Sequence, residues 1–105
     1  MKKYLDDNFQ QQLTLDDLSS KFYVSKYYMS REFKRVFGMN VLSYLMQKRI
    51  DYAKVLLAET TLSAEQIAKR CGFSGINYFA RQFKKSEGMT SLEYRKKAAP
   101  KKEEE

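Results

Sequence analysis

Residues 72–88 read GFSGINYFARQFKKSEG, and this stretch decides the fold. Its rings and basic side chains are interleaved, and a glycine stands at each end. Phe79 and Phe83 recur at helical spacing, which predicts an amphipathic helix with a buried aromatic face and a basic face opposite. A closely similar stretch, VSKYYMSREFKRVFG, occupies residues 24–38.

The similarity extends into a longer internal repeat. Residues 28–45 and 78–95 share the pairs Tyr28/Tyr78, Arg31/Arg81, Phe33/Phe83, Lys34/Lys84, Gly38/Gly88, Met39/Met89, Leu42/Leu92 and Tyr44/Tyr94. Matching residues of the two copies are one residue closer together in the sequence before the turn than after it, so the second copy has an additional residue near Gly75. A solenoid needs at least about three repeats, so we interpret this as a duplicated unit.

Helical spacing fills the chain between its glycines, and no segment alternates like a strand, so the expected fold class is all-α. We predict seven helices, at roughly residues 1–10, 15–22, 26–37, 41–58, 64–71, 75–87 and 91–98. Their start signals are capping boxes at Thr14, Ser63 and Thr90, and further N-caps at Ser25, Asn40 and Ser74. Gly38 and Gly88 are expected where helices end with positive φ.

Each copy is a short helix, a turn and a second helix, which is the outline of a helix-turn-helix. The expected organisation is a first helix-turn-helix subdomain at 1–40, a linker helix at 41–58, a second subdomain at 59–98 and a disordered tail at 99–105. In the first core Leu18, Phe22 and Val24 should face Met29, Phe33 and Phe37. In the second, Ile67, Cys71 and Phe73 should face Phe79 and Phe83.

The linker helix is expected to bury one face and expose another. Its apolar stripe comprises Leu42, Leu45, Met46, Ile50, Ala53 and Leu57. Its polar side has Lys48, Arg49 and Lys54, for which phosphate contact and a solvated flank remain equal alternatives.

Composition narrows the function. The 105 residues suit one domain or two small subdomains, and 20 Lys and Arg against 13 Asp and Glu give a net charge of +7. Such an excess suits nucleic acid or an anionic surface, or simply keeps the protein in solution. No apolar run reaches the ~18 residues of a membrane span, so we expect a cytoplasmic protein with no membrane partner.

An enzyme is not expected. The chain has no histidine for general base chemistry, no glycine-rich phosphate loop and no cluster of metal ligands. We therefore predict no catalytic residue, metal or cofactor. The lone cysteine, Cys71, is expected to be a small buried apolar residue rather than a nucleophile.

The basic face of the later helix in each copy suits DNA. Asn77, Ala80, Arg81 and Lys84 follow the i, i+3, i+4, i+7 rule, and Tyr27, Ser30, Arg31 and Lys34 do the same in the first copy. Arginine can bond bidentately to guanine, asparagine to adenine, and alanine can contact a thymine methyl group. One such face would be an ordinary solvated surface, but two in the same register favour double-stranded DNA.

The chain resembles the DNA-binding domain of AraC/XylS-type bacterial transcription regulators. The resemblance rests on LDDLSSKFYVSKYYMSREFKRVFGMN, on YLMQKRIDYAKVLLAETTLSAEQIAKRCGFSGINYFARQFKKSEG and on SLEYR. It implies two helix-turn-helix subdomains that read neighbouring major grooves from one side of the duplex. The base-reading residues it implies are Tyr27, Ser30 and Arg31, then Ile76, Asn77, Ala80 and Arg81. The expected phosphate contacts are Lys34, Arg35, Asn40, Lys84, Lys85 and Thr90.

The chain departs from that family at two helix starts, where Val41 and Ser91 replace a common proline. The resemblance also implies RNA polymerase as a partner, together with a sensor or receiver domain. The chain is then an excised C-terminal domain or a naturally short regulator. The alternative function is a protein-interaction module that binds an acidic partner. RNA is a weaker alternative, because its narrow major groove excludes a helix.

Overall fold

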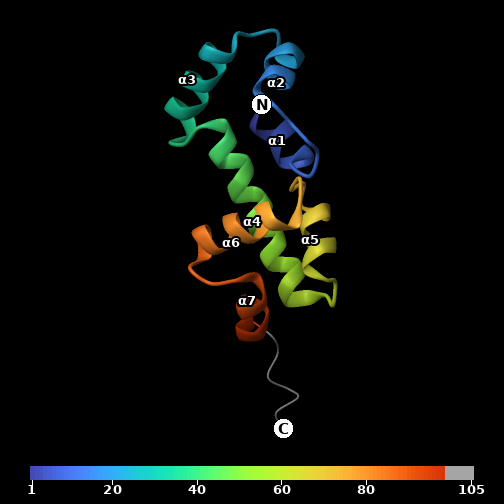
Figure 1. The fold of residues 1–105 in the computed structure, drawn as a ribbon. Helices are drawn as coiled ribbons and strands as arrows, with labels where there is room; N and C mark the ends of the chain where they lie inside the picture. Colours follow the sequence, from blue (N-terminus) through green and yellow to red (C-terminus); the bar gives the residue numbers. More distant parts are fainter. Residues whose placement is uncertain (99–105) are drawn as a thin grey trace.

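The computed structural model describes residues 1–98, so the predicted tail at 99–105 lies outside the described residues. Within residues 1–98 the structure has seven helices and no strand (Figure 1). Their bounds are α1 Lys2–Asn8, α2 Leu15–Phe22, α3 Lys26–Phe37, α4 Val41–Glu59, α5 Ala64–Arg70, α6 Ile76–Glu87 and α7 Ser91–Ala98. The all-α prediction is confirmed, with the helix ends within two residues of their expected positions.

Local capping explains why the helix boundaries could be predicted from the sequence. The predicted capping boxes at Thr14 and Ser63 both form, and Thr90 exchanges hydrogen bonds of 2.8 and 3.1 Å with Glu93. Ser25 and Asn40 cap α3 and α4 as predicted, and Gly38 and Gly88 end α3 and α6 with φ of 80° and 76°.

The prediction that Ser74 caps α6 is wrong. The N-cap is Gly75, which makes no side-chain cap hydrogen bond. Ser25 directly precedes α3, whereas the additional residue of the second copy moves Ser74 one position away from its helix. The hydroxyl is therefore out of register with the first turn.

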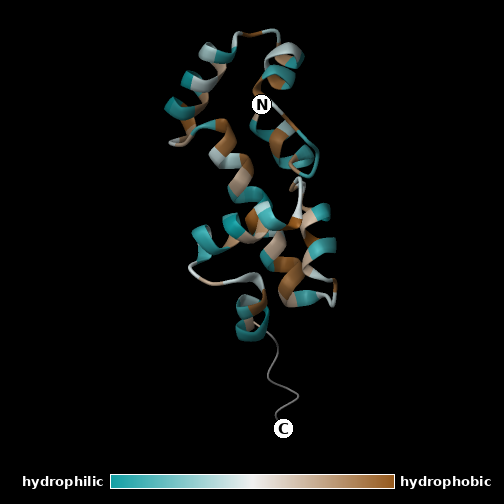
Figure 2. Ribbon diagram, in the orientation of Figure 1, coloured by the Kyte–Doolittle hydropathy of each residue, from teal (hydrophilic) through white to brown (hydrophobic). Residues whose placement is uncertain are grey.

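Two hydrophobic cores share α4, which runs between the α1–α3 group and the α5–α7 group (Figure 1). Figure 2 shows hydrophobic residues along α4 and mostly hydrophilic stretches on α3 and α6. The first core comprises Leu5, Leu18, Met29, Phe33, Val41 and Leu45. The second comprises Ile50, Ala53, Leu56, Leu57, Ile67, Ala68, Cys71, Phe73, Phe79 and Phe83.

Two predicted core positions are corrected. Leu42 is 51% exposed, and Val41 is fully buried in its place. Consecutive residues of an α-helix are separated by ~100° around its axis, so burying Val41 turns Leu42 outward. Phe37 is 39% exposed although its ring centroid lies 4.6 Å from that of Phe33, so it covers the edge of the core rather than filling it.

The three basic residues of α4 contact other parts of the chain. Lys48 pairs with Asp6 at 3.5 Å, and Lys54 pairs with Glu87 at 3.1 Å. The Arg49 guanidinium donates to the backbone carbonyls of the loop between α1 and α2. These charges of the linker helix therefore hold neighbouring parts of the chain. The alternatives expected from the sequence, phosphate contact or a solvated flank, do not include this role.

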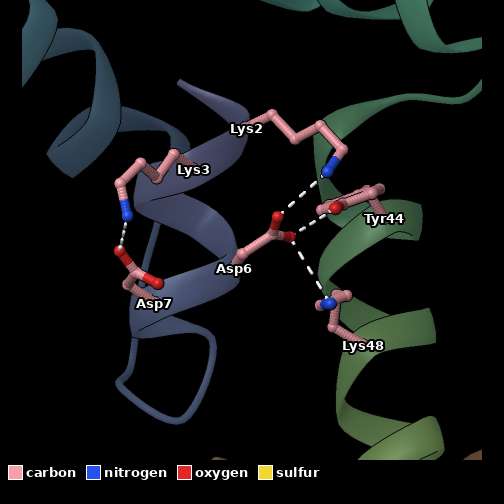
Figure 3. A network of polar contacts seen from close by, with 6 residues as sticks. All are labelled: Lys2, Lys3, Asp6, Asp7, Tyr44 and Lys48. Atoms are coloured by element: carbon pink, nitrogen blue, oxygen red, sulfur yellow. Dashed lines mark hydrogen bonds and ion pairs between the residues drawn. The ribbon is translucent and has the colours of Figure 1, made fainter.

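Asp6 joins α1 to α4 through a polar network (Figure 3). Its carboxylate accepts hydrogen bonds from the Tyr44 hydroxyl and from the Lys2 ammonium at 3.0 Å, and lies 3.5 Å from that of Lys48. These donors stabilise the charged form and lower the pKa of Asp6 to about 2. The network fixes α1 across the first half of the linker helix.

Candidate nucleic-acid interface

The second helix of each helix-turn-helix is held by its hydrophobic face. Phe79 and Phe83 of α6 are fully buried, and Met29 and Phe33 of α3 are 3% and 4% exposed. In the view of Figure 1, α3 lies beside the N-terminal half of α4, and α6 crosses α4 farther along, with its C-terminal end on the same side as α3. The cores thus direct the opposite faces of both helices toward solvent.

The exposed face of α6 contains every residue that the sequence assigned to it. Asn77, Ala80, Arg81 and Lys84 are all exposed. Ile76 is 39% exposed, and it also lines a hollow of about 360 Å³ between the start of α6 and α5. The helix therefore presents an amide, a methyl group and two cations along one stripe.

The corresponding face of α3 is more aromatic. Tyr27 is 73% exposed, and the Arg31 guanidinium lies over its ring, 5.1 Å from the centroid. This cation–π contact restricts Arg31 before any ligand is bound. Ser30 is half-buried and lines a hollow of about 270 Å³ together with Asn40.

The basic residues among the predicted phosphate contacts differ in whether another side chain of the protein already pairs with their charge. Lys34, Lys84 and Lys85 are exposed in the last turns of α3 and α6. Arg35 instead donates two hydrogen bonds, of 2.8 and 3.0 Å, to Glu32, and this pair lowers the pKa of the Glu32 carboxyl. Arg35 is therefore a weaker candidate than Lys85 at the equivalent position.

Asn40 and Thr90 already cap helices, yet each retains a donor. The Asn40 Oδ1 accepts from the Ser43 N–H at 2.9 Å, which leaves its amide NH₂ group for an outside acceptor. The Thr90 hydroxyl oxygen accepts from the Glu93 N–H at 3.1 Å, and its O–H can still be donated. Both positions are exposed.

Sequence reasoning did not single out Tyr23, the C-cap of α2 in the turn before α3. Its side chain is 94% exposed and its backbone is left-handed, with φ of 56°. The repeat could have predicted the left-handed backbone of Tyr23, because this residue aligns with Gly72 of the second copy.

Cys71 is fully buried, and burial raises the pKa of its thiol to about 12, so it is a small apolar core residue as predicted. Among residues 1–98, no three His, Cys, Asp or Glu side chains lie close enough to hold a metal ion. The same residues include no helix with both the length and the hydrophobicity needed to cross a membrane.

Comparison with known proteins identifies the family. The family model described as a helix-turn-helix domain matches residues 18–97. The uncharacterized HTH-type transcriptional regulator YdiP of Escherichia coli is 33% identical over 93 residues, covering 89% of this chain but 31% of that protein. The chain thus spans about a third of the length of the curated relatives it matches first.

Two solved structures have the same architecture over nearly the whole chain. The C-terminal domain of the response regulator yesN from Fusobacterium nucleatum has a TM-score of 0.87 at 39% identity, covering 90% of this chain and 92% of that one. The DNA-binding domain of AdpA, solved with a target DNA, has a TM-score of 0.84 at 25% identity, covering 89% and 84%. The chain therefore belongs to the helix-turn-helix family of AraC/XylS-type transcription regulators.

Proposed function

We propose that α3 and α6 enter two neighbouring major grooves on one side of a DNA duplex. Sequence-specific DNA binding by a transcription regulator is the function of this family, and the AdpA relative was solved on its target DNA. The observation that carries the two-groove arrangement is the pair of equivalent, largely exposed stripes on α3 and α6, each helix packed in a separate core along α4. The 19 residues of α4 span ~28 Å, near the ~34 Å between successive major-groove faces.

Within each groove the exposed stripe divides into two roles. Arg31 and Arg81 are the strongest candidates for bidentate contact with guanine, and Asn77 suits adenine. Tyr27, Ser30, Ile76 and Ala80 complete the proposed base-reading surface. Lys34, Arg35, Asn40, Lys84, Lys85 and Thr90 are the proposed phosphate contacts, which position the helices but carry no base information.

Two subdomains with α4 between them are the proposed organisation, and the separate cores on either half of α4 support it. The proposal requires no catalytic activity, cofactor or metal, and it places the domain with bacterial DNA in the cytoplasm. RNA polymerase and a sensor or receiver domain remain proposed partners that rest on the family resemblance. A module that binds only acidic protein partners is the less favoured alternative.

Selection from a random pool of DNA duplexes tests the proposal. We expect the bound sequences to contain two short specified blocks about one helical turn apart. Unrelated duplex DNA should compete for binding at low salt, because phosphate contacts are independent of sequence. Selection that returns no specified block, or only one, would contradict the two-groove arrangement.

A further inference from the structure

A loop of the first half of the chain reaches the second half. This loop connects α1 to α2 and lies beside the turn between α5 and α6 (Figure 1). The Gln12 side-chain amide donates a hydrogen bond of 2.7 Å to the backbone carbonyl of Gly72. The two halves therefore have a second point of attachment besides α4 itself.

Gly72 permits an unusually close approach at this point. It has φ of 93°, and a Cβ atom built on it would lie 2.8 Å from the carbonyl oxygens of both Phe9 and Gln10. Both oxygens belong to the backbone, which cannot move aside as a flexible side chain can. Any larger residue would push the loop away from the second half.

Arg49 holds the same loop from the middle of α4. Its Nε donates to the Phe9 carbonyl at 2.7 Å, and its guanidinium NH₂ donates to the Gln11 carbonyl at 2.8 Å. The Phe9 ring meets the Tyr52 ring of α4 edge-on, with centroids 5.7 Å apart. The planar guanidinium fixes two successive parts of the loop at once.

We propose that these contacts determine the spacing between the two blocks of the DNA site. Phe9, Gln11, Gln12, Arg49 and Gly72, together called the junction, attach the first half to the second on one side of α4. An isolated helix can bend and twist, but a second attachment beside it restricts both motions. The junction residues are thus positioning residues that set the distance and angle between α3 and α6.

This inference rests on the proposed two-groove function and adds a measurable specificity to it. Each added base pair moves one block by ~3.4 Å and rotates it by ~35° about the duplex axis. A rigid pair of recognition helices should tolerate only one such spacing. A loosened pair should accept neighbouring spacings at the expense of the preferred one.

The test measures affinity for duplexes that contain both selected blocks, with the spacing changed by one or two base pairs. The variants are Gln12→Ala, Arg49→Lys and Gly72→Ala. We expect the ratio of affinities between the best and the neighbouring spacings to fall ~10-fold in Arg49→Lys, the equivalent of one lost charge-assisted contact, and by a smaller factor in Gln12→Ala, whose amide donates to a neutral carbonyl. Affinity for a duplex with a single block should stay unchanged, because each helix-turn-helix keeps its own core.

Tyr44→Phe is the matched control, because it removes a contact between α1 and α4 that lies within the first half. It should lower the melting temperature and leave the spacing profile unchanged. Gln12 is exposed, so Gln12→Ala keeps the test valid even if Gly72→Ala fails to fold.

The possible outcomes distinguish a failure of the junction's role from a failure of the proposed two-groove function. A wild-type protein that binds a duplex with both blocks no more tightly than a duplex with one block would contradict the two-groove function itself. A wild-type protein that binds both blocks at every spacing equally well would overturn the role of the junction. A wild-type preference that Gln12→Ala and Arg49→Lys both retain would overturn the role of the junction. A profile that broadens equally in Tyr44→Phe would show that general stability, rather than the junction, sets the spacing.

Discussion

Tyr23 and Gly72 occupy equivalent positions in the two copies of the repeat, and both have a left-handed backbone, with φ of 56° and 93°. The residue after each one donates its N–H to a carbonyl of the preceding helix. Val24 donates to the Ser19 carbonyl at 3.1 Å, and Phe73 donates to the Ala68 carbonyl at 3.0 Å. Glycine adopts this conformation freely, whereas tyrosine loses ~1–2 kcal/mol to steric strain. The Tyr23 ring is 94% exposed, so packing does not offset that strain.

Tyr23→Gly should therefore raise the free energy of unfolding by ~0.5–1 kcal/mol, because the relieved strain exceeds the entropy gained by the unfolded chain. Chemical denaturation measures this directly. Gly72→Ala is the opposite exchange and should destabilise the protein, since it adds both strain and a 2.8 Å approach to backbone oxygens. A Tyr23→Gly protein less stable than wild type would contradict the strain argument.

The Asp6 network predicts a dependence of stability on pH. The pKa of Asp6 is lowered from its usual 3.8 to about 2, chiefly by the Tyr44 hydroxyl and then by Lys2. A lowered pKa contributes stability above the unfolded-state value, and that stability is lost as the pH falls through the folded-state value. The Asp6 side chain is 27% exposed, so solvent screening reduces the full ~2 kcal/mol of this shift to ~1 kcal/mol. Asp6→Asn should thus destabilise by ~1 kcal/mol near neutral pH, and the difference should vanish between about pH 4 and pH 2.

Asp7→Asn is the matched control for this prediction. It makes the same charge change one residue along α1, where the Lys3–Asp7 pair is exposed to solvent (Figure 3). Its effect should be below ~0.5 kcal/mol at neutral pH. Urea titrations at several pH values measure the free energy of unfolding of both variants. Equal losses in the two variants would show that the Asp6 network contributes no more stability than the exposed Lys3–Asp7 pair.

The sequence predicted the helices well because their start signals are local. A hydroxyl at Thr14 or Ser63 meets an N–H only three residues away, and Gly38 ends its own helix. The duplicated basic faces were likewise readable, since helical spacing alone places Arg81 opposite Phe79. The proposed DNA contacts themselves remain predictions.

Contacts between distant residues were not readable. Lys48 and Arg49 looked like members of a polar flank, but their partners lie about 40 residues earlier, in α1 and the following loop. Gly72 was visible as a glycine, yet nothing local distinguished a turn from a close approach to the Phe9 and Gln10 carbonyls. Packing of one half against the other decides these roles.

Ser91→Pro should leave stability unchanged or raise it by up to ~1 kcal/mol. Ser91 is the first residue of α7, where a helix leaves its N–H without an intrahelical partner. Proline fits that position, and it restricts the unfolded chain. Glu93→Pro is the control, because the Glu93 N–H donates to the Thr90 hydroxyl oxygen at 3.1 Å and its loss should be destabilising. Thermal melts of both variants check the boundary of α7, and a clear loss in Ser91→Pro would contradict it.

DNA affinity should depend steeply on salt. With roughly six to ten phosphate contacts, affinity should fall by ~10³ to 10⁵ between about 50 and 200 mM salt. Lys84→Ala should reduce the slope of log affinity against log salt by ~1. Arg35→Ala should reduce it less, because Glu32 already pairs with that guanidinium. Binding that hardly changes with salt would contradict the phosphate contacts.

The two arginines of the repeat separate the two proposed grooves. Arg81→Ala should cost ~1–3 kcal/mol on the selected site and relax specificity in one block only, and Arg31→Ala should relax the other block. Lys84→Ala should instead weaken binding to all sequences alike, because a phosphate contact carries no base information. Tyr27→Ala should act on the same block as Arg31→Ala, since its ring restrains that guanidinium at 5.1 Å. Repeated site selection with each variant measures these patterns. If both arginine variants blur the same block, or neither changes the selected sequence, then α3 and α6 do not read separate grooves.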